Sequence, residues 1–183
     1  MTITLAVDNT KKPMTTIRRA EDGDVADVYM LLVDEMYPET GIVPLDRAKA
    51  TAYILETFAK GYVFVAEDKG EIIGSIGLMV GDPFWYSAQR ALYDRWTFVK
   101  KGHRGKAFDL LIRAAHDMAQ NGSIPYVTAV QTVNETDRKN QLFRRRGMTP
   151  IGEVFVKGLD LCVSETCSAE AVAAVAADPT PKL

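Results

Sequence analysis

The clearest hydrophobic pattern in this chain is one apolar stripe of helical period, just past the middle of the sequence. The stripe comprises Ala107, Leu110, Leu111, Ala114, Ala115 and Met118. Spacings of three and four residues place these side chains on one face of a helix. The apolar and aromatic residues that precede it favour a strand, and they are Ala91, Leu92, Trp96, Phe98 and Val99. Residues 91–119 therefore predict a strand, a short loop and an amphipathic helix.

Strand-like and helix-like patterns also alternate along the rest of the chain. Strands are predicted at 15–20, 62–66, 71–80, 126–132 and 154–156, and helices at 25–36, 45–60 and 134–146. Asp68-Lys69-Gly70 is typical of a hairpin turn between two of these strands. The order is strand, two helices, three strands, helix, strand, helix, strand. This order favours a mixed α/β sheet with helices packed on it.

Three segments of different composition divide the chain. Residues 1–14 show no sustained period and are expected to form a flexible leader, whereas residues 15–162 carry the predicted domain. Residues 163–183 form an Ala-rich tail that we expect to be disordered. A length of 183 residues suits one domain with tails better than two domains.

Composition and charge argue against several classes of protein. A hydrophobic content of 47% and a charged content of 25% match a globular protein, and a net charge of -2 argues against a dedicated nucleic-acid binder. The sequence has no apolar run long enough for a membrane span, and its N-terminus lacks the pattern of a secretion signal. Cys162 and Cys167 are expected to be reduced thiols rather than a bridge. Together these features predict a cytoplasmic protein.

The loop between the predicted strand and the amphipathic helix is the best candidate for a binding site. Its sequence, Lys100-Lys101-Gly102-His103-Arg104-Gly105-Lys106, combines four cations with two glycines. Backbone N–H groups at a helix start, together with positive charge, favour an anion and above all a phosphate. We expect Arg104 and Lys106 to bind it, the alternative being a solvated basic loop. Lys100 and Lys101 are expected to face solvent, with long-range steering of an anion as the alternative. His103 is also expected to be exposed, with contact to a phosphate as the alternative.

The order of elements and the residues of this loop resemble the GNAT family of acyl-CoA N-acyltransferases. The loop motif is Val99, four residues, and then Arg104-Gly105-Lys106-Ala107 at the start of a long helix. Two further motifs agree: the hairpin Ala66-Glu67-Asp68-Lys69-Gly70-Glu71-Ile72-Ile73-Gly74, and Asn134 followed by Leu142-Phe143-Arg144-Arg145-Arg146-Gly147-Met148. The resemblance covers residues 15–159.

The resemblance implies a mixed, mostly antiparallel sheet whose central strands splay apart, with helices on both faces. It also implies that acetyl-CoA binds in this opening. Its pantetheine arm would pair with backbone near Phe98 and Val99 and contact Asn134, and its pyrophosphate would lie over the amides of residues 104–109. The implied cofactor-binding residues are Phe98, Val99, Arg104, Gly105, Lys106, Ala107 and Asn134.

Two loop positions depart from the family's pattern, which is Arg or Gln, two residues, Gly, one residue, and then Gly or Ala; a third departure lies in another motif. Ala107 and Asp109 occupy the last two positions. A carboxylate at Asp109 would repel a pyrophosphate, although a first-turn Asp favours the helix and this one lies opposite the apolar stripe. Phe143 stands where many members carry a tyrosine that protonates the leaving thiolate. Phe has no proton to give, so solvent, Tyr93 or Tyr126 would have to supply it.

Acyl transfer to an amine requires a base, because an alkylamine with a pKa near ~10.4 is mostly protonated at neutral pH. A carboxylate can collect that proton directly or through one water. Asp94 on the predicted central strand is the first candidate, and Glu67 on the facing hairpin is the second. The structural alternative for Asp94 is a strand-end carboxylate paired with Arg95 or solvent, and Glu67 has a similar structural alternative. Backbone N–H groups at a strand bulge would stabilise charge on the thioester oxygen.

Several other residues have competing interpretations. No His, Cys and acidic residues have metal-ligand spacing, so no metal site is expected, and His116 is expected on the surface opposite the apolar stripe. We expect the basic segment 138–146 to be a solvated face that provides positive charge for the cofactor's ribose phosphate. The alternative is a contact with nucleic acid. We expect Phe84-Trp85-Tyr86 to fill the core or to form a contact in a homodimer. The functional alternative is that this segment lines the acceptor pocket.

These observations predict an N-acetyltransferase that moves an acetyl group from acetyl-CoA to a primary amine. Direct attack in a ternary complex is expected, because no cysteine lies near the proposed site. One alternative is a non-catalytic CoA-binding or partner-binding module, motivated by Asp109 and Phe143. Another is an acyltransferase that acts on nucleic acid or a charged tRNA, supported only by the Arg-rich helix. The acceptor, whether a small molecule or a peptide amine, is not specified by these patterns.

Overall fold

The computed structural model describes residues 15–41, 43–82, 88–128 and 136–150. The predicted features that lie outside the described residues are the leader 1–14, the aromatic loop 84–86, Asn134, the strand 154–156, both cysteines and the tail 163–183.

The chain divides into two compact units. The first comprises residues 1–36 and 47–129, and the second comprises residues 37–46 and 130–183. The first unit contains the sheet with helices α1 (Val25–Met30), α3 (Arg47–Lys60) and α4 (Lys106–Asn121). The second contains α2 (Tyr37–Thr40) and α5 (Thr136–Arg145) in its described part.

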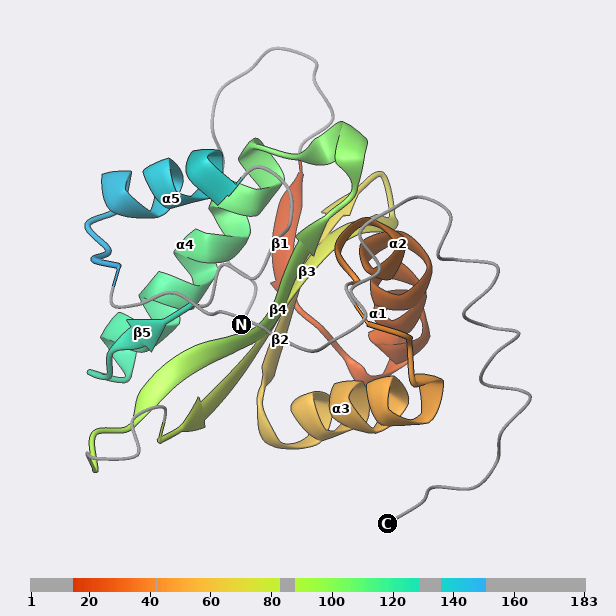
Figure 1. The fold of residues 1–183 in the computed structure, drawn as a ribbon, viewed down its shortest axis with the longest axis horizontal. Helices are drawn as coiled ribbons and strands as arrows, with labels where there is room; N and C mark the ends of the chain where they lie inside the picture. Colours follow the sequence, from red (N-terminus) through yellow and green to blue (C-terminus); the bar gives the residue numbers. More distant parts are fainter. Residues whose placement is uncertain (1–14, 42, 83–87, 129–135, 151–183) are drawn as a thin grey trace. The chain divides into compact units, whose positions relative to one another are not determined.

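The described strands form a single sheet in the order β1-β2-β3-β4-β5. They are β1 (Thr16–Arg19), β2 (Tyr62–Asp68), β3 (Glu71–Gly81), β4 (Ala91–Val99) and β5 (Tyr126–Val127). Neighbouring strands from β1 to β4 are antiparallel, whereas β5 runs parallel to β4 after a helical crossover. The predicted mixed, mostly antiparallel sheet is confirmed (Figure 1).

Helices cover both faces of the sheet, as the resemblance implies (Figure 1). One face carries α1 (Val25–Met30) and α3 (Arg47–Lys60), and the other carries α4 (Lys106–Asn121). The predicted helix over 25–36 is not uniformly α-helical, because α1 continues as the π-helical segment η2 (Leu31–Met36). No helix in the described ranges is both long enough and apolar enough to cross a bilayer.

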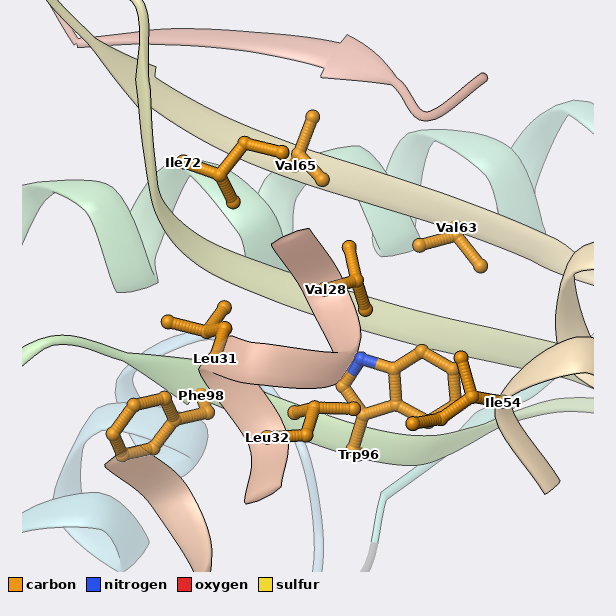
Figure 2. Packing of buried hydrophobic residues seen from close by; sticks show 9 residues of the cluster. All are labelled: Val28, Leu31, Leu32, Ile54, Val63, Val65, Ile72, Trp96 and Phe98. Atoms are coloured by element: carbon orange, nitrogen blue, oxygen red, sulfur yellow. The ribbon is translucent and has the colours of Figure 1, made fainter. Parts of the chain in front are cut away.

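A hydrophobic cluster fills the space between the sheet and helices α1 and α3 (Figure 2). Its buried members are Val28, Leu31, Leu32, Ile54, Val63, Val65, Ile72, Trp96 and Phe98. The indole of Trp96 donates a hydrogen bond from Nε1 to the buried Ser75 Oγ at 3.2 Å. A Cβ atom at Gly77 would meet this indole at 2.5 Å, so only glycine fits opposite Trp96. On the other face the predicted apolar stripe is confirmed in part: Ala107, Leu111 and Ala115 are buried, whereas Leu110, Ala114 and Met118 are only partly buried. The buried face also includes Ile112 and Ala119, which the stripe did not contain.

In the second unit, helix α5 ends as the sequence predicts. Gly147 has a φ of 77°, and its N–H donates to the carbonyl of Arg144 at 3.0 Å. This left-handed residue closes the helix in the conformation that glycine adopts most readily. Phe143 is buried within the chain, with 8% of its surface exposed.

Candidate active site

A β-bulge interrupts the pairing of β3 with β4. Gly77 pairs with Trp96, and the next residue, Leu78, pairs with Asp94. Arg95 is therefore an extra residue in β4, opposite no residue of β3. Such a bulge bends its strand and changes the direction of nearby side chains.

The bulge determines which face of the sheet Asp94 occupies. In a regular strand Asp94, Trp96 and Phe98 would share a face, because side chains alternate. With the extra residue, Trp96 and Phe98 belong to the cluster under α1 and α3, whereas Asp94 bonds to Thr97. The bulge thus separates the carboxylate from the hydrophobic cluster.

Two hydroxyl groups fix the orientation of the Asp94 carboxylate. Thr97 Oγ1 donates to Asp94 Oδ2 at 3.0 Å, and Thr128 Oγ1, immediately after β5, donates to the same oxygen at 2.9 Å. The alternative partner considered from the sequence, Arg95, pairs instead with Glu56 of α3 at 2.8 Å.

Strand β4 changes partners close to Asp94. Pairs between β4 and β5 are Leu92 with Tyr126 and Tyr93 with Val127. Beyond Tyr93, and within the described ranges, β4 pairs with β3 alone. This is the region in which the resemblance places the pantetheine arm. At the end of β4, Arg104 Nε donates to the Val99 carbonyl at 3.2 Å.

A short turn carries the chain from β4 into α4. It includes the 3-10 helix η3 (Lys101–His103) and then Gly105, which has a φ of 97° and a ψ of -89°. The Asp109 N–H donates to the Gly105 carbonyl at 2.9 Å, which is the start of helical bonding. The N–H groups of Lys106 and Ala107 precede this bond and have no helical carbonyl to donate to.

Exposure differs sharply across this turn. Residues 101–106 are exposed, so an anion can approach their backbone and their cations. Ala107 is only 1% exposed, and it therefore contributes close packing of the helix start rather than accessible surface. Lys101 and Lys106 form no ion pair with another described residue.

Other charges of the turn are engaged within the protein. Lys100 Nζ lies 2.7 Å from Glu71 Oε1 and 3.3 Å from Glu35 Oε1, so Lys100 is paired with two carboxylates at the surface. Hydrogen bonding to Glu71 raises the pKa of Lys100, with Glu35 adding to the effect. His103 Nδ1 lies 3.7 Å from Asp68 Oδ2.

Asp109 forms an ion pair within α4. Its Oδ2 lies 3.1 Å from Arg113 Nε, one helical turn further along α4. This pairing agrees with the expected sideways orientation of Asp109 and offsets its repulsion of an anion at the helix start.

Glu67, the second candidate base, lies in a different part of the sheet. Its Oε2 accepts from Arg18 Nε at 2.9 Å, and Arg18 also binds both carboxylate oxygens of Asp24. Leu78 of β3 pairs with Asp94 on one side and with Tyr62 of β2 on the other. Glu67 is five residues further along β2 than Tyr62. That offset is roughly 16 Å along the strands. The structure does not bring the two candidate carboxylates together.

Tyr126 and His116 form a second polar feature near Asp94. Burial raises the pKa of the Tyr126 phenol, and the charge of Asp94 acts in the same direction. The His116 ring packs edge-on against Tyr126, with 5.2 Å between the ring centroids. The Nε2 atom of His116 is buried without a hydrogen bond, and burial lowers the pKa of this histidine. The expectation that His116 is a surface residue is wrong.

Sequence reasoning missed a cluster on the other side of the bulge. This Arg95 cluster consists of Arg95, Glu56 and Tyr53. The Arg95 guanidinium lies 3.3 Å from the centroid of the Tyr53 ring, and its Nη1 lies 2.8 Å from Glu56 Oε2. No local sequence pattern predicts the contact between Arg95 and Glu56, because these residues are 39 positions apart. Thr128, 34 positions from Asp94, was missed for the same reason, whereas the bond from Thr97, three positions away, depends on the bulge.

Among the described residues no three His, Cys, Asp or Glu side chains gather into a group that could hold a metal ion. Phe143, the position of the missing tyrosine, belongs to the second unit.

Comparison with known proteins identifies relatives of this arrangement. The chain matches the sequence profile of the Acetyltransferase (GNAT) family over residues 18–148. Its structure resembles that of aminoglycoside N-acetyltransferase AAC(6')-Iy in complex with CoA, with a TM-score of 0.64 and 14% identity, covering 81% of this chain and 97% of that chain.

Two further solved structures have a similar fold. A predicted acetyltransferase from Clostridium acetobutylicum with acetyl-CoA gives a TM-score of 0.60 at 17% identity, covering 79% of this chain and 96% of that one. An acetyltransferase from Trypanosoma brucei gives 0.59 at 16% identity, covering 80% and 100%. No functionally curated protein matches the chain in sequence.

Proposed function

The chain belongs to the GNAT family of acetyltransferases, and we propose that it transfers the acetyl group of acetyl-CoA to a primary amine by direct attack in a ternary complex. Family membership makes it an acetyl-CoA-dependent acetyltransferase. The amine acceptor and the order of events are our proposal. The observation that carries it is the Asp94 carboxylate, oriented by two threonine hydroxyls beside the bulge of β4.

Asp94 is the proposed general base. A primary amine is mostly protonated at neutral pH and cannot attack until the proton is removed. The hydrogen bonds from Thr97 and Thr128 hold the carboxylate in one orientation, which proton transfer over a short distance requires. The bulge also leaves Arg95 opposite no residue of β3, so backbone N–H groups here are suited to stabilise negative charge on a carbonyl oxygen.

The turn before α4 suits the pyrophosphate of acetyl-CoA. Arg104, Gly105 and Lys106 are exposed and offer cations and backbone N–H groups at a helix start. The small Ala107 lets the helix start pack closely, and Asp109 is held by Arg113. These residues fit a diphosphate.

We place the pantetheine arm along the part of β4 that contains Phe98 and Val99. Asn134, outside the described residues, is proposed to contact the same arm. When bound, acetyl-CoA supplies an activated thioester, and the residues of this chain orient it and remove the proton of the amine.

Direct transfer is favoured over an acyl-enzyme because the only cysteines are Cys162 and Cys167, far in sequence from β4. The departing thiolate would take its proton from solvent or from Tyr93. Tyr126 is the poorer donor of the two tyrosines, since burial raises the pKa of its phenol.

The test is CoA release from acetyl-CoA with a panel of primary amines. The panel includes aminoglycosides, polyamines, peptides with a free N-terminus and peptides with lysine. We expect turnover with at least one class, intersecting initial-velocity lines, and no acetylated protein by mass spectrometry after incubation with acetyl-CoA alone. Parallel lines with a trapped acetyl group would contradict direct transfer.

Phe143 is buried and cannot protonate the departing thiolate, so the proton has to come from another group. Tight binding of CoA by calorimetry without turnover of any amine in the panel would refute the proposed transfer to a primary amine.

A further inference from the structure

We propose that Arg95 is a positioning residue whose guanidinium, held by Glu56 and Tyr53 of α3, fixes the bulge that turns Asp94 away from the hydrophobic cluster. This inference rests on the proposed function, since it assigns to Arg95 a role in orienting the proposed base. It concerns the face of the sheet opposite to Asp94.

The contacts of Arg95 are close and well shielded. Its side chain is 9% exposed, its Nη1 lies 2.8 Å from Glu56 Oε2, and its guanidinium stacks 3.3 Å from the Tyr53 ring centroid. The Tyr53 ring in turn lies 6.3 Å from the ring of Trp96, the next residue of β4. A planar cation between a carboxylate and an aromatic face has one preferred orientation.

The bulge itself needs an anchor. Arg95 has no paired residue in β3, so the ladder that fixes its neighbours does not fix it. Both residues that contact its guanidinium belong to α3, a helix of 14 residues that packs on β2 and β3. The side chain of Arg95 therefore ties the extra residue to a rigid element.

Loss of the anchor has a specific consequence for Asp94. If β4 slips by one residue and the bulge is removed, Asp94 moves to the face of Trp96 and Phe98. There it would lose the hydroxyls of Thr97 and Thr128 that now orient it. The expected effect is therefore on the chemical step rather than on acetyl-CoA binding.

Single variants test the role of Arg95. Arg95→Met removes the cation, and Glu56→Gln removes the charge of its partner. The Glu56 side chain is 42% exposed, so Glu56→Gln is expected to fold. Lys60→Met is the matched control, because Lys60 also pairs with Glu56, at 3.2 Å, but is 68% exposed and belongs to α3 rather than to β4.

We expect kcat to fall by about tenfold to a hundredfold in Arg95→Met and Glu56→Gln, with the KM for acetyl-CoA within about twofold of wild type. The double variant should be no worse than the poorer single variant, because both changes remove one contact. Arg95→Lys should recover part of kcat, since an ammonium still reaches Glu56. Lys60→Met should match wild type.

Amide hydrogen exchange provides a readout that needs no substrate. Exchange at residues 94–97 should accelerate in Arg95→Met and Glu56→Gln at temperatures well below unfolding, and should not change in Lys60→Met. Wild-type exchange and kcat in Glu56→Gln, or equal losses in Lys60→Met, would overturn the proposal. If wild type acetylates no amine, the proposed function fails while the exchange result still decides the role of Arg95.

Discussion

Asp94 owes its chemical environment to one inserted residue and two hydroxyl groups. The extra Arg95 places Asp94 on the same face as Thr97, and Thr128 immediately follows β5, which pairs with β4 at Leu92 and Tyr93. Glu67, by contrast, is neutralised by an arginine that it shares with Asp24. These environments favour Asp94 as the base and a structural role for Glu67.

Replacement of Asp94 by Asn should lower kcat by about 10²- to 10⁴-fold, because the amide cannot collect the proton of the amine. The KM for acetyl-CoA should stay close to the wild-type value. Steady-state kinetics with the best amine of the panel measures both. Glu67→Gln is the control and should keep kcat within about twofold while lowering thermal stability slightly. A large loss in Glu67→Gln and none in Asp94→Asn would reverse the assignment.

His116 should make the stability of the protein depend on pH in mildly acidic solution. Burial lowers the pKa of His116 below its ordinary value of 6.5, although nearby Asp117 opposes the shift. Between the folded and unfolded pKa values the unfolded chain binds more protons, so the free energy of unfolding falls as the pH drops below 6.5. Urea unfolding at several pH values measures this fall.

The chain offers a matched control for this effect, since it contains only two histidines. His116→Gln should show a shallower loss of stability between neutral and mildly acidic pH than wild type. His103→Gln, which changes the other histidine, is the matched comparison. Identical slopes in His116→Gln and wild type would show that His116 is not the responsible group.

At the scale of elements, the start of α4 depends on one backbone conformation. Gly105 combines a φ of 97° with a ψ of -89°, a region that other residues rarely occupy. This conformation directs the chain from η3 into the helix, so that the N–H groups of Lys106 and Ala107 precede the bond from Asp109 to Gly105. The geometry of the proposed phosphate site is therefore set by this residue.

Gly105→Ala should lower the free energy of unfolding by about 1–3 kcal/mol and raise the KM for acetyl-CoA. The reason is backbone strain alone, because a Cβ atom at Gly105 meets nothing within 4 Å. Gly102→Ala is the control, since a Cβ atom there also meets nothing and its φ is not in the left-handed region. Denaturant unfolding and acetyl-CoA titrations compare the two. Equal effects in both variants would argue against a role for the Gly105 conformation.

At the scale of the first unit, ion pairs connect elements that are distant in sequence. Arg18 of β1 joins Asp24 of η1 (Asp22–Asp24) to Glu67 of β2. Lys100, just after β4, joins Glu35 of η2 to Glu71 of β3. Lys100 directly precedes the turn before α4, so a ligand at that turn is expected to stabilise the unit.

CoA should raise the unfolding temperature of the protein by several degrees. A ligand that binds only the folded state, at a hundredfold excess over its Kd, adds about 2.7 kcal/mol to the free energy of unfolding. Differential scanning fluorimetry with and without CoA measures the shift, and the chelator EDTA should cause none. An unchanged midpoint at millimolar CoA would contradict the coenzyme site, and a midpoint lowered by EDTA would reveal a metal.

Helix α4 and the hairpin of β2 and β3 could be predicted from the sequence because each depends on residues that are close along the chain. The stripe from Ala107 to Met118 specified α4, and the turn Asp68-Lys69-Gly70 specified the hairpin of β2 and β3. The π-helical form of η2 could not be predicted, because its residues keep a helical apolar period. The partial burial of His116 could not be predicted either, since it depends on contact with Tyr126 of β5.

The sequence by itself determined the order of elements, the basic turn at a helix start and the resemblance to the acetyltransferase family, because each is written in residues that are close along the chain. Only the tertiary structure decided the face on which Asp94 lies, its separation from Glu67 and the contacts of Arg95 with α3. Strand register, bulges and ion pairs depend on residues that meet only after folding, and a shift of one residue in register exchanges the two faces of a strand.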